Sequence, residues 1–201
     1  MSILFSEQDT IFTINYPTEK MSEEEFHAFC AANPKMRIEQ DQYQNVTVMP
    51  PIHVDSGFYE SEVMGEVRAY AKRTKTGVAL SPSTGFKLPN GATRSPGACW
   101  ISNERWSTLS TKEKQKFSPV VPDFVIEIRS RTDTLKKLQA KMQEWIDNGV
   151  RLAWLIDPKK QQVTIYRKNI EPEIMEGFEH ILSGEDVMPG FEFDLKLLKI
   201  P

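Results

Sequence analysis

The chain has 201 residues, of which 39% are hydrophobic and 26% are charged, and its formal net charge is -3. These values are typical of a globular protein and exclude a disordered one. No apolar run approaches the roughly 20 residues of a membrane-spanning helix, and no secretory signal is visible at the start. Because Cys30 and Cys99 form no C-x-x-C pair, we expect no zinc site and no disulfide framework, and therefore a cytoplasmic protein. Because no apolar run is long enough, we expect no membrane partner.

The net charge hides an uneven distribution along the chain. Residues 1–66 carry a net charge of -9, residues 67–168 a net charge of +12 and residues 169–201 a net charge of -6. A basic segment between acidic ends favours a polyanionic partner such as nucleic acid. The alternative is that the charges are mixed on the folded surface. If the division has a function, the basic residues should line the side of the active site and the acidic ends should lie away from it.

The first part of the chain predicts two helices separated by an extended segment. Ser22 and Glu25 have capping-box spacing, and the apolar residues that follow form a stripe. Residues 37–48 alternate weakly, which favours extended structure. Residues 56–74 show helical periodicity, and Gly77 is expected to cap that helix.

The middle of the chain predicts short strands and then a strand–helix–strand unit. The short strands are expected at 78–80, 84–88 and 98–101, followed by a polar helical pair within 103–117. Residues 121–128 read as a central strand, Asp133 is expected to cap a helix that runs to about Asn148, and strands follow at 151–156 and 161–166. This order predicts a parallel crossover. The tail from Ile170 is expected to be irregular and to dock through its leucines, which are Leu195, Leu197 and Leu198.

An acidic residue, Glu127, lies within the apolar central strand. A buried carboxylate is costly unless it is paired, hydrogen-bonded or bound to a metal. Asp123 shares its face of the strand, but four residues separate the two by about 13 Å, which is too far for ligands that lie about 2.0–2.6 Å from one ion. A metal site here therefore needs carboxylates from other elements. The alternative is a strand-end acid paired with a basic neighbour.

Lys141 lies just outside the apolar stripe of the following helix, beside Trp145. From that edge its long stem can follow the apolar surface and deliver an ammonium group toward the end of the sheet. The alternative is an ordinary surface lysine.

Several segments together resemble a known family. They are residues 85–96 (GFKLPNGATRSP), 100–101 and 104–106, 122–130 (PDFVIEIRS), 141–145, and 149–158 (GVRLAWLIDP). In combination they resemble a family of small endonucleases abundant in cyanobacteria, which belongs to the restriction-endonuclease-like PD-(D/E)xK superfamily. The resemblance covers roughly residues 20–195.

The resemblance implies an α/β fold of the α+β mixed-sheet type, with a central mixed β-sheet flanked by helices and an N-terminal helical and extended addition. From the length and the element pattern we expect one nuclease-like domain over residues 1–201, with a core at about 56–167, an N-terminal extension at 1–55 and a C-terminal docking tail at 168–201. The resemblance also implies a hydrolase that cleaves phosphodiesters with a divalent cation, Mg²⁺ or Mn²⁺. The metal-binding acids correspond to Glu66 and Glu127. The catalytic residues correspond to Glu127 and Lys141. Arg129 stands where the superfamily usually has its lysine, and in this family the lysine lies on the following helix, which points to Lys141.

The sequence departs from the family pattern at one position. The family's Pro-Asp falls where this chain has Pro96-Gly97, so the aspartate that would bind the metal is missing. Losing a group that contributes about 4 kcal/mol in the transition state would cost roughly 10³ in rate. The sequence therefore leaves two hypotheses. One is an endonuclease, impaired at Gly97, that acts on nucleic acid, with DNA expected, as a homodimer by analogy. The other is an inactive nuclease-fold module that binds nucleic acid or a protein partner.

Overall fold

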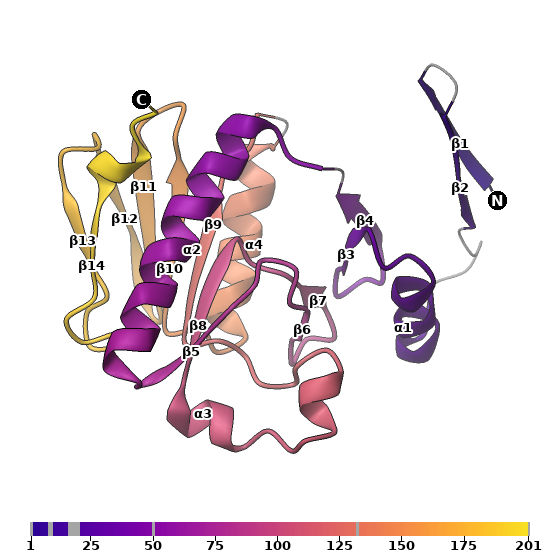
Figure 1. Cartoon of the computed structure of the whole chain (residues 1–201), viewed down its shortest axis with the longest axis horizontal. Coiled ribbons are helices and arrows are strands. Elements are labelled where there is room, and N and C mark those ends of the chain that lie inside the picture. Colours follow the sequence, from indigo (N-terminus) through magenta and orange to yellow (C-terminus); the bar gives the residue numbers. More distant parts are fainter. Residues whose placement is uncertain (1, 8–9, 16–20, 50, 132, 201) are drawn as a thin grey trace.

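The computed structural model describes residues 2–7, 10–15, 21–49, 51–131 and 133–200. A six-stranded sheet forms its centre (Figure 1). In spatial order its strands are β12 (Ile170–Glu176), β11 (Gln162–Arg167), β10 (Leu152–Asp157), β9 (Phe124–Ile128), β8 (Ala98–Ser102) and β5 (Gly77–Leu80). Only β9 and β10 are parallel to each other, and every other neighbouring pair in this sheet is antiparallel. The mixed sheet that the sequence predicted is confirmed.

The parallel pair is joined by helix α4 (Leu135–Asp147), which confirms the predicted crossover. The helix ends close to the predicted place, with Asn148 as its C-cap and Gly149 in the left-handed region at φ 108°. Its start differs from the prediction. Thr134 is the N-cap, while the carboxylate of Asp133 accepts a hydrogen bond from the backbone N–H of Ser130. That bond stabilises the turn between β9 and α4 instead of the helix terminus.

Two helices cover opposite faces of the sheet (Figure 1). Helix α2 (Val54–Thr74) packs Val63 and Val67 on one face, where Phe124 and Ile126 of β9 are buried. Helix α4 covers the other face, where Val125 is buried. Since side chains alternate along a strand, Glu127 follows Val125 onto the α4 face. The alternation of side chains along β9 thus points the Glu127 carboxylate toward α4, the helix that carries Lys141.

A smaller four-stranded sheet adjoins the core. In spatial order it contains β4 (Val46–Met49), β3 (Arg37–Gln40), β7 (Thr93–Arg94) and β6 (Phe86–Lys87). It brings the N-terminal strands β3 and β4 beside the loop that leads into β8. Helix α1 (Glu23–Ala32) precedes β3 and has the predicted capping box, in which Ser22 and Glu25 bond reciprocally. A separate hairpin pairs β1 (Ser2–Glu7) with β2 (Thr10–Asn15).

The C-terminal tail is regular where irregular structure was expected. Strand β12 extends the central sheet at its edge, and β13 (Ile181–Ser183) pairs with β14 (Glu192–Asp194). The prediction was wrong because acidic residues and Pro172 lower strand propensity, whereas an edge strand tolerates both. Docking is confirmed for Leu195 and Leu198, which lie in the short 3₁₀ helix η2 (Leu195–Leu198) and are buried, but Leu197 stays exposed.

Three smaller predictions changed in detail. Helix α2 ends at Thr74, and its C-cap is Lys75, in the left-handed conformation, instead of the predicted Gly77. Strand β6 is shorter than predicted. The region 103–117 contains α3 (Asn103–Ser107) and the 3₁₀ helix η1 (Glu113–Gln115). Of the helices in the described residues, none combines the length and the apolar character needed to cross a bilayer.

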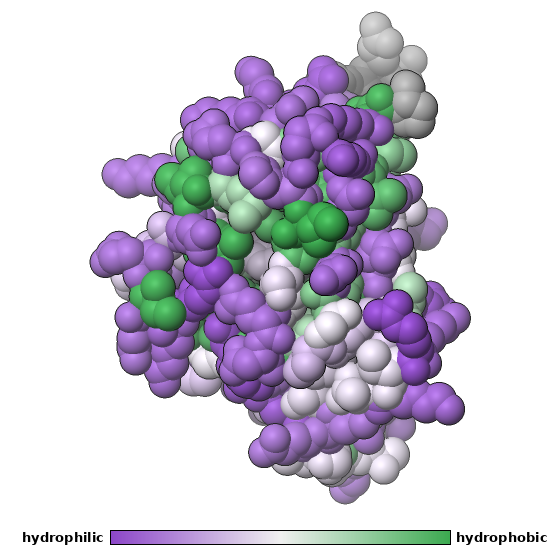
Figure 2. Space-filling model, turned by 90° about the vertical axis from the view of Figure 1, so that its left-hand side faces the viewer, coloured by the Kyte–Doolittle hydropathy of each residue, from purple (hydrophilic) through white to green (hydrophobic). Residues whose placement is uncertain are grey.

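The face that carries the C-terminal strands is largely hydrophilic, with scattered hydrophobic groups (Figure 2). The exposed hydrophobic residues of the C-terminal strands include Ile170 and Ile174 on β12 and Ile181 on β13. Charged side chains and Pro172 on β12 disfavour pairing of this edge with another strand.

Two glycine substitutions test this packing in opposite directions. A Cβ at Gly77 would collide with the carbonyl oxygen of Ile101 and the indole of Trp100. We expect Gly77→Ala to lower the free energy of unfolding by about 1–3 kcal/mol. Gly65 lies within α2, and a Cβ there would meet nothing within 4 Å, so Gly65→Ala should raise the free energy of unfolding by about 0.5–1 kcal/mol. Urea unfolding of both variants measures these changes, and a shift of equal sign would contradict the expectation.

Candidate active site

Glu127 lies near the C-terminal end of β9, paired in register with Leu155 of β10. It is only 6% exposed. Its Oε1 accepts a hydrogen bond from Trp145 Nε1 at 3.1 Å and lies 2.8 Å from Lys141 Nζ. Both partners come from α4, so the crossover helix compensates the buried charge on the strand. The carboxylate is thus paired, as its position in an apolar strand required.

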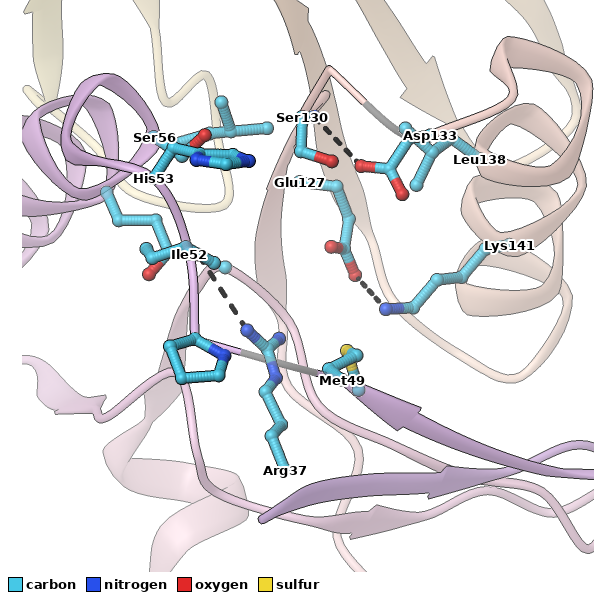
Figure 3. A pocket seen from close by; sticks show the side chains of 14 residues that line it. Arg37, Met49, Ile52, His53, Ser56, Glu127, Ser130, Asp133, Leu138 and Lys141 are labelled. Atoms are coloured by element: carbon cyan, nitrogen blue, oxygen red, sulfur yellow. Dashed lines mark hydrogen bonds and ion pairs between the residues drawn. The ribbon is translucent and has the colours of Figure 1, made fainter. Parts of the chain in front are cut away.

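Lys141 projects from the edge of α4 into the same place (Figure 3). Its ammonium group contacts Glu127, and it also donates to Glu39 Oε1 at 2.9 Å and to the carbonyl oxygen of Ser95 at 3.2 Å. Burial opposes protonation of Lys141, but the charges of Glu127 and Glu39 outweigh it and raise the pKa of the ammonium group. Lys141 is therefore a buried, charged group at the end of the sheet and not an ordinary surface lysine.

A chain of buried and partly buried charges continues beyond Lys141. Glu39 of β3 is 4% exposed and also faces Arg94, whose Nη1 lies 3.4 Å from Glu39 Oε2. Arg94 Nε in turn donates to Glu144 Oε2 at 2.6 Å. Burial favours the neutral form of Glu39, but Lys141 and Arg94 together outweigh it and lower the pKa of this carboxyl group. The network links the small sheet to α4.

A pocket opens beside the Glu127–Lys141 pair (Figure 3). Glu60 of α2 and Arg37 of β3 also line it, and Arg37 Nη1 lies 3.7 Å from Glu60 Oε1. Burial, together with the negative charge of Glu127, raises the pKa of Glu60 despite the nearby Arg37. The negative charges of Glu60 and Glu127 repel each other across the pocket. A cation bound between them would stabilise the ionised form of both carboxylates.

Gly97 lines the same pocket, immediately before β8. A Cβ at this position would lie 3.0 Å from the carbonyl oxygen of Ile126 and 3.8 Å from the Cα of Glu127. A side chain here would start directly beside Glu127. The aspartate that the resemblance implies at this position would therefore start beside Glu127.

The structure brings together Glu127, Lys141 and Gly97, but it leaves Glu66 outside the pocket lining. Glu66 follows Glu60 by six residues on α2, which corresponds to about 9 Å along the axis and a rotation of about 120° away from the face of Glu60. The α2 carboxylate that lines this pocket is therefore Glu60. The pocket lining does not support Glu66 as a metal ligand, which stays a prediction. Both are acids on one helix, and sequence spacing alone did not show which turn faces β9.

The other charged residues of the central strand have separate partners. Asp123 lies 3.2 Å from Arg105 Nε and accepts a hydrogen bond from the backbone N–H of Ser102 at 2.8 Å. Arg129 pairs with Asp157 at 2.7 Å. Neither lines the pocket of Glu127, so neither supplies the missing carboxylate or an alternative ammonium.

The expected spatial division of charge is wrong. The acidic N-terminal segment contributes Glu39 and Glu60 to the site itself. Ion pairs join the basic middle of the chain to both acidic ends, namely Lys87–Glu23, Arg94–Glu39, Arg131–Asp55, Arg151–Asp186 and Arg167–Glu185. Acidic residues of both ends thus lie beside basic residues of the middle, and two of them lie at the site, so the acidic ends do not lie away from it.

Sequence reasoning missed Glu39, Glu60 and Arg37. Glu39 offered a weak signal, since it is an acid beside Ile38 in a segment expected to be extended. Its partner Lys141 is 102 positions away, and no local pattern links the two. The set of residues available to a metal is small. No group of three or more His, Cys, Asp or Glu side chains in the described part of the chain could hold an ion. The carboxylates that line the pocket are Glu60, Glu127 and Asp133, and the Asp133 carboxylate accepts a hydrogen bond from the backbone N–H of Ser130.

The lowered pKa of Glu39 gives the fold a dependence on pH. Its ionised form stabilises the native state above the free glutamate pKa of about 4.3, and this contribution is lost as the pH falls through the lowered folded value. We expect Glu39→Gln to reduce the free energy of unfolding by about 3 kcal/mol at neutral pH and by much less once the carboxyl is protonated. Urea unfolding at neutral and acid pH measures both differences. The control Glu171→Gln, at an exposed residue of β12, should change stability by less than about 0.5 kcal/mol at either pH, and a pH-independent effect of Glu39→Gln would contradict the expectation.

Comparison with known proteins identifies the family. A crystal structure from Anabaena variabilis, described as "a putative nuclease belonging to DUF820", matches with a TM-score of 0.69 and 19% sequence identity, covering 80% of this chain and 88% of that chain. This likeness confirms the fold that the sequence resemblance implied. No curated protein sequence matches the chain. The family model Uma2, described as "Putative restriction endonuclease", matches residues 23–196. The chain therefore belongs to this restriction-endonuclease-like family.

Proposed function

We propose that this protein is a metal-dependent nuclease that hydrolyses phosphodiester bonds in nucleic acid, with a turnover reduced by the glycine at position 97. The observation that carries the proposal is the pair Glu127–Lys141, which faces Glu60 across a single pocket at the end of the parallel strands. Family membership supports a nuclease-like activity. DNA as the substrate, a homodimer and a cytoplasmic location stay predictions.

Glu60 and Glu127 are the residues that would hold Mg²⁺ or Mn²⁺. Their donor set fits such an ion, because Mg²⁺ in phosphate-processing sites keeps several waters and binds one or two carboxylates together with substrate phosphates. The raised pKa of Glu60, caused by burial and by Glu127, supports the assignment, since a cation would favour the ionised form. When bound, the ion polarises a phosphoryl oxygen and lowers the pKa of a bound water.

Two cationic side chains of the chain itself face the pocket. The ammonium group of Lys141 places a positive charge beside Glu127, where it would stabilise negative charge on the reacting phosphate. Arg37 lines the opposite wall, and its Nε is buried with no hydrogen-bond partner in the described residues. A guanidinium group suits phosphate oxygens, so we assign Arg37 to orient the phosphate and Lys141 to stabilise its charge.

A cleavage assay on plasmid and oligonucleotide substrates with Mg²⁺ or Mn²⁺ tests the proposal. We expect slow cleavage by the wild type and a loss of at least about 10²-fold in Glu127→Gln and Glu60→Gln. Glu66→Gln is a matched control on the same helix and should stay near the wild-type rate. No metal-dependent cleavage by the wild type or by Gly97→Asp would exclude the catalytic proposal.

Restoring the family carboxylate should increase activity. Gly97→Asp places a carboxylate beside Glu127, and a gain of up to about 10³-fold in rate corresponds to roughly 4 kcal/mol of transition-state stabilisation. Gly97→Ala introduces the same Cβ, which lies 3.0 Å from the carbonyl oxygen of Ile126, without a carboxylate. It therefore controls for backbone crowding. Equal rates in the two variants would show that the missing carboxylate does not limit the reaction.

The second candidate function is an inactive nuclease-fold module that binds nucleic acid. Gly97 favours it, because this position supplies no carboxylate and no group of three or more His, Cys, Asp or Glu side chains in the described residues could hold a metal ion. This function predicts binding that weakens with salt through phosphate contacts, needs no divalent metal and survives Glu127→Ala. Fluorescence anisotropy with labelled DNA and RNA at several salt concentrations measures this. Tight Mg²⁺ binding by calorimetry that is lost in Glu127→Ala would favour the nuclease instead.

A further inference from the structure

The ammonium group of Lys141 has one oxygen partner for each of its N–H donors. An ammonium has three N–H donors and no acceptor. The structure supplies three oxygen acceptors within reach, namely Glu127 Oε1 at 2.8 Å, Glu39 Oε1 at 2.9 Å and the carbonyl oxygen of Ser95 at 3.2 Å. A flexible four-carbon side chain is thus held in one place.

Two of these three acceptors depend on strand β3. Glu39 Oε1 also accepts a hydrogen bond from the backbone N–H of Ser95 at 3.0 Å, which fixes the residue whose carbonyl faces Lys141. Arg37 Nη2, from the same strand, donates to that carbonyl oxygen at 2.6 Å. Residues of β3 therefore form or fix two of the three oxygen partners of Lys141. We call these three partners, Glu127, Glu39 and the carbonyl oxygen of Ser95, the socket of Lys141.

We propose that Glu39 is a positioning residue for Lys141, which holds the ammonium group against Glu127 and toward the pocket. The consequence for catalysis rests on the proposed function, in which Lys141 stabilises charge on the phosphate. Without Glu39, Glu127 is the one charged partner that the described residues leave to the lysine, and its stem regains rotational freedom. Glu39 itself lies outside the pocket lining, so its effect acts through Lys141.

A purely structural tie between the small sheet and α4 is the competing explanation. Glu144 offers a matched control, because it joins the small sheet to α4 without contacting Lys141 in the part of the chain that the structure describes. It lies three positions after Lys141 on α4 and binds Arg94 of β7 at 2.6 Å. Glu144→Gln thus weakens the same junction between sheet and helix but leaves the socket of Lys141 intact.

Steady-state kinetics with Mg²⁺ or Mn²⁺ separate the two explanations. Glu39→Met removes both acceptor oxygens at similar side-chain length, and we expect kcat to fall by about 10–100-fold while KM changes by less than about twofold. Glu39→Asp, which retains the charge, should recover part of kcat, and Glu144→Gln should retain the wild-type kcat. If Glu39→Met does not fold, Glu39→Gln serves in its place. An unchanged kcat in the Glu39 variant, or an equal loss in Glu144→Gln, would overturn the proposal.

A second readout does not require activity. In proton–nitrogen NMR spectra of protein labelled at lysine Nζ, a buried ammonium group with three acceptors exchanges slowly and should give a signal. We expect this signal for Lys141 in the wild type and in Glu144→Gln, identified by its absence in Lys141→Met, and its loss in Glu39→Met. A signal that persists in Glu39→Met would overturn the positioning role. If the wild type cleaves nothing, the proposed function fails while this comparison still decides whether Glu39 positions Lys141.

Discussion

The site depends on one buried ammonium group shared between two buried carboxylates. Lys141 joins Glu127 of the central sheet to Glu39 of the small sheet, and it does so from the helix that connects the two parallel strands. Each of the three charges would be costly alone in this environment. Together they hold the central sheet, the small sheet and the crossover helix at one junction, and the pocket opens beside that junction.

The crossover explains why this junction lies where it does. Because β9 and β10 are parallel, α4 must return along the sheet and pack on one of its faces. Alternation along β9 places Val125 and Glu127 on that face, while Phe124 and Ile126 pack under α2. The same periodicity that buries the core therefore delivers the carboxylate to the lysine.

Ion pairing across the chain also changes how its charge should be understood. Glu39 and Glu60 belong to the acidic N-terminal segment, yet both lie at the site, and Arg151 and Arg167 are neutralised by the acidic tail. Charge segregated along a sequence does not imply charge segregated in space, because folding places opposite charges beside one another. The support for a nucleic-acid partner therefore comes from the family and from the chemistry of the pocket, and not from net charge.

The sequence by itself determined the features that depend on local patterns. Periodicity and caps predicted helices α1, α2 and α4, the central strand and the crossover, and they placed Glu127 in an apolar strand and Lys141 at the edge of a helix stripe. The family resemblance predicted that Gly97 stands where the family has an aspartate. Only the tertiary structure showed that Lys141 pairs with Glu39 and that Glu60, and not Glu66, lines the pocket. These contacts join residues far apart in sequence, and the turn of a helix that faces a strand is set by packing against the whole core, which no local spacing contains.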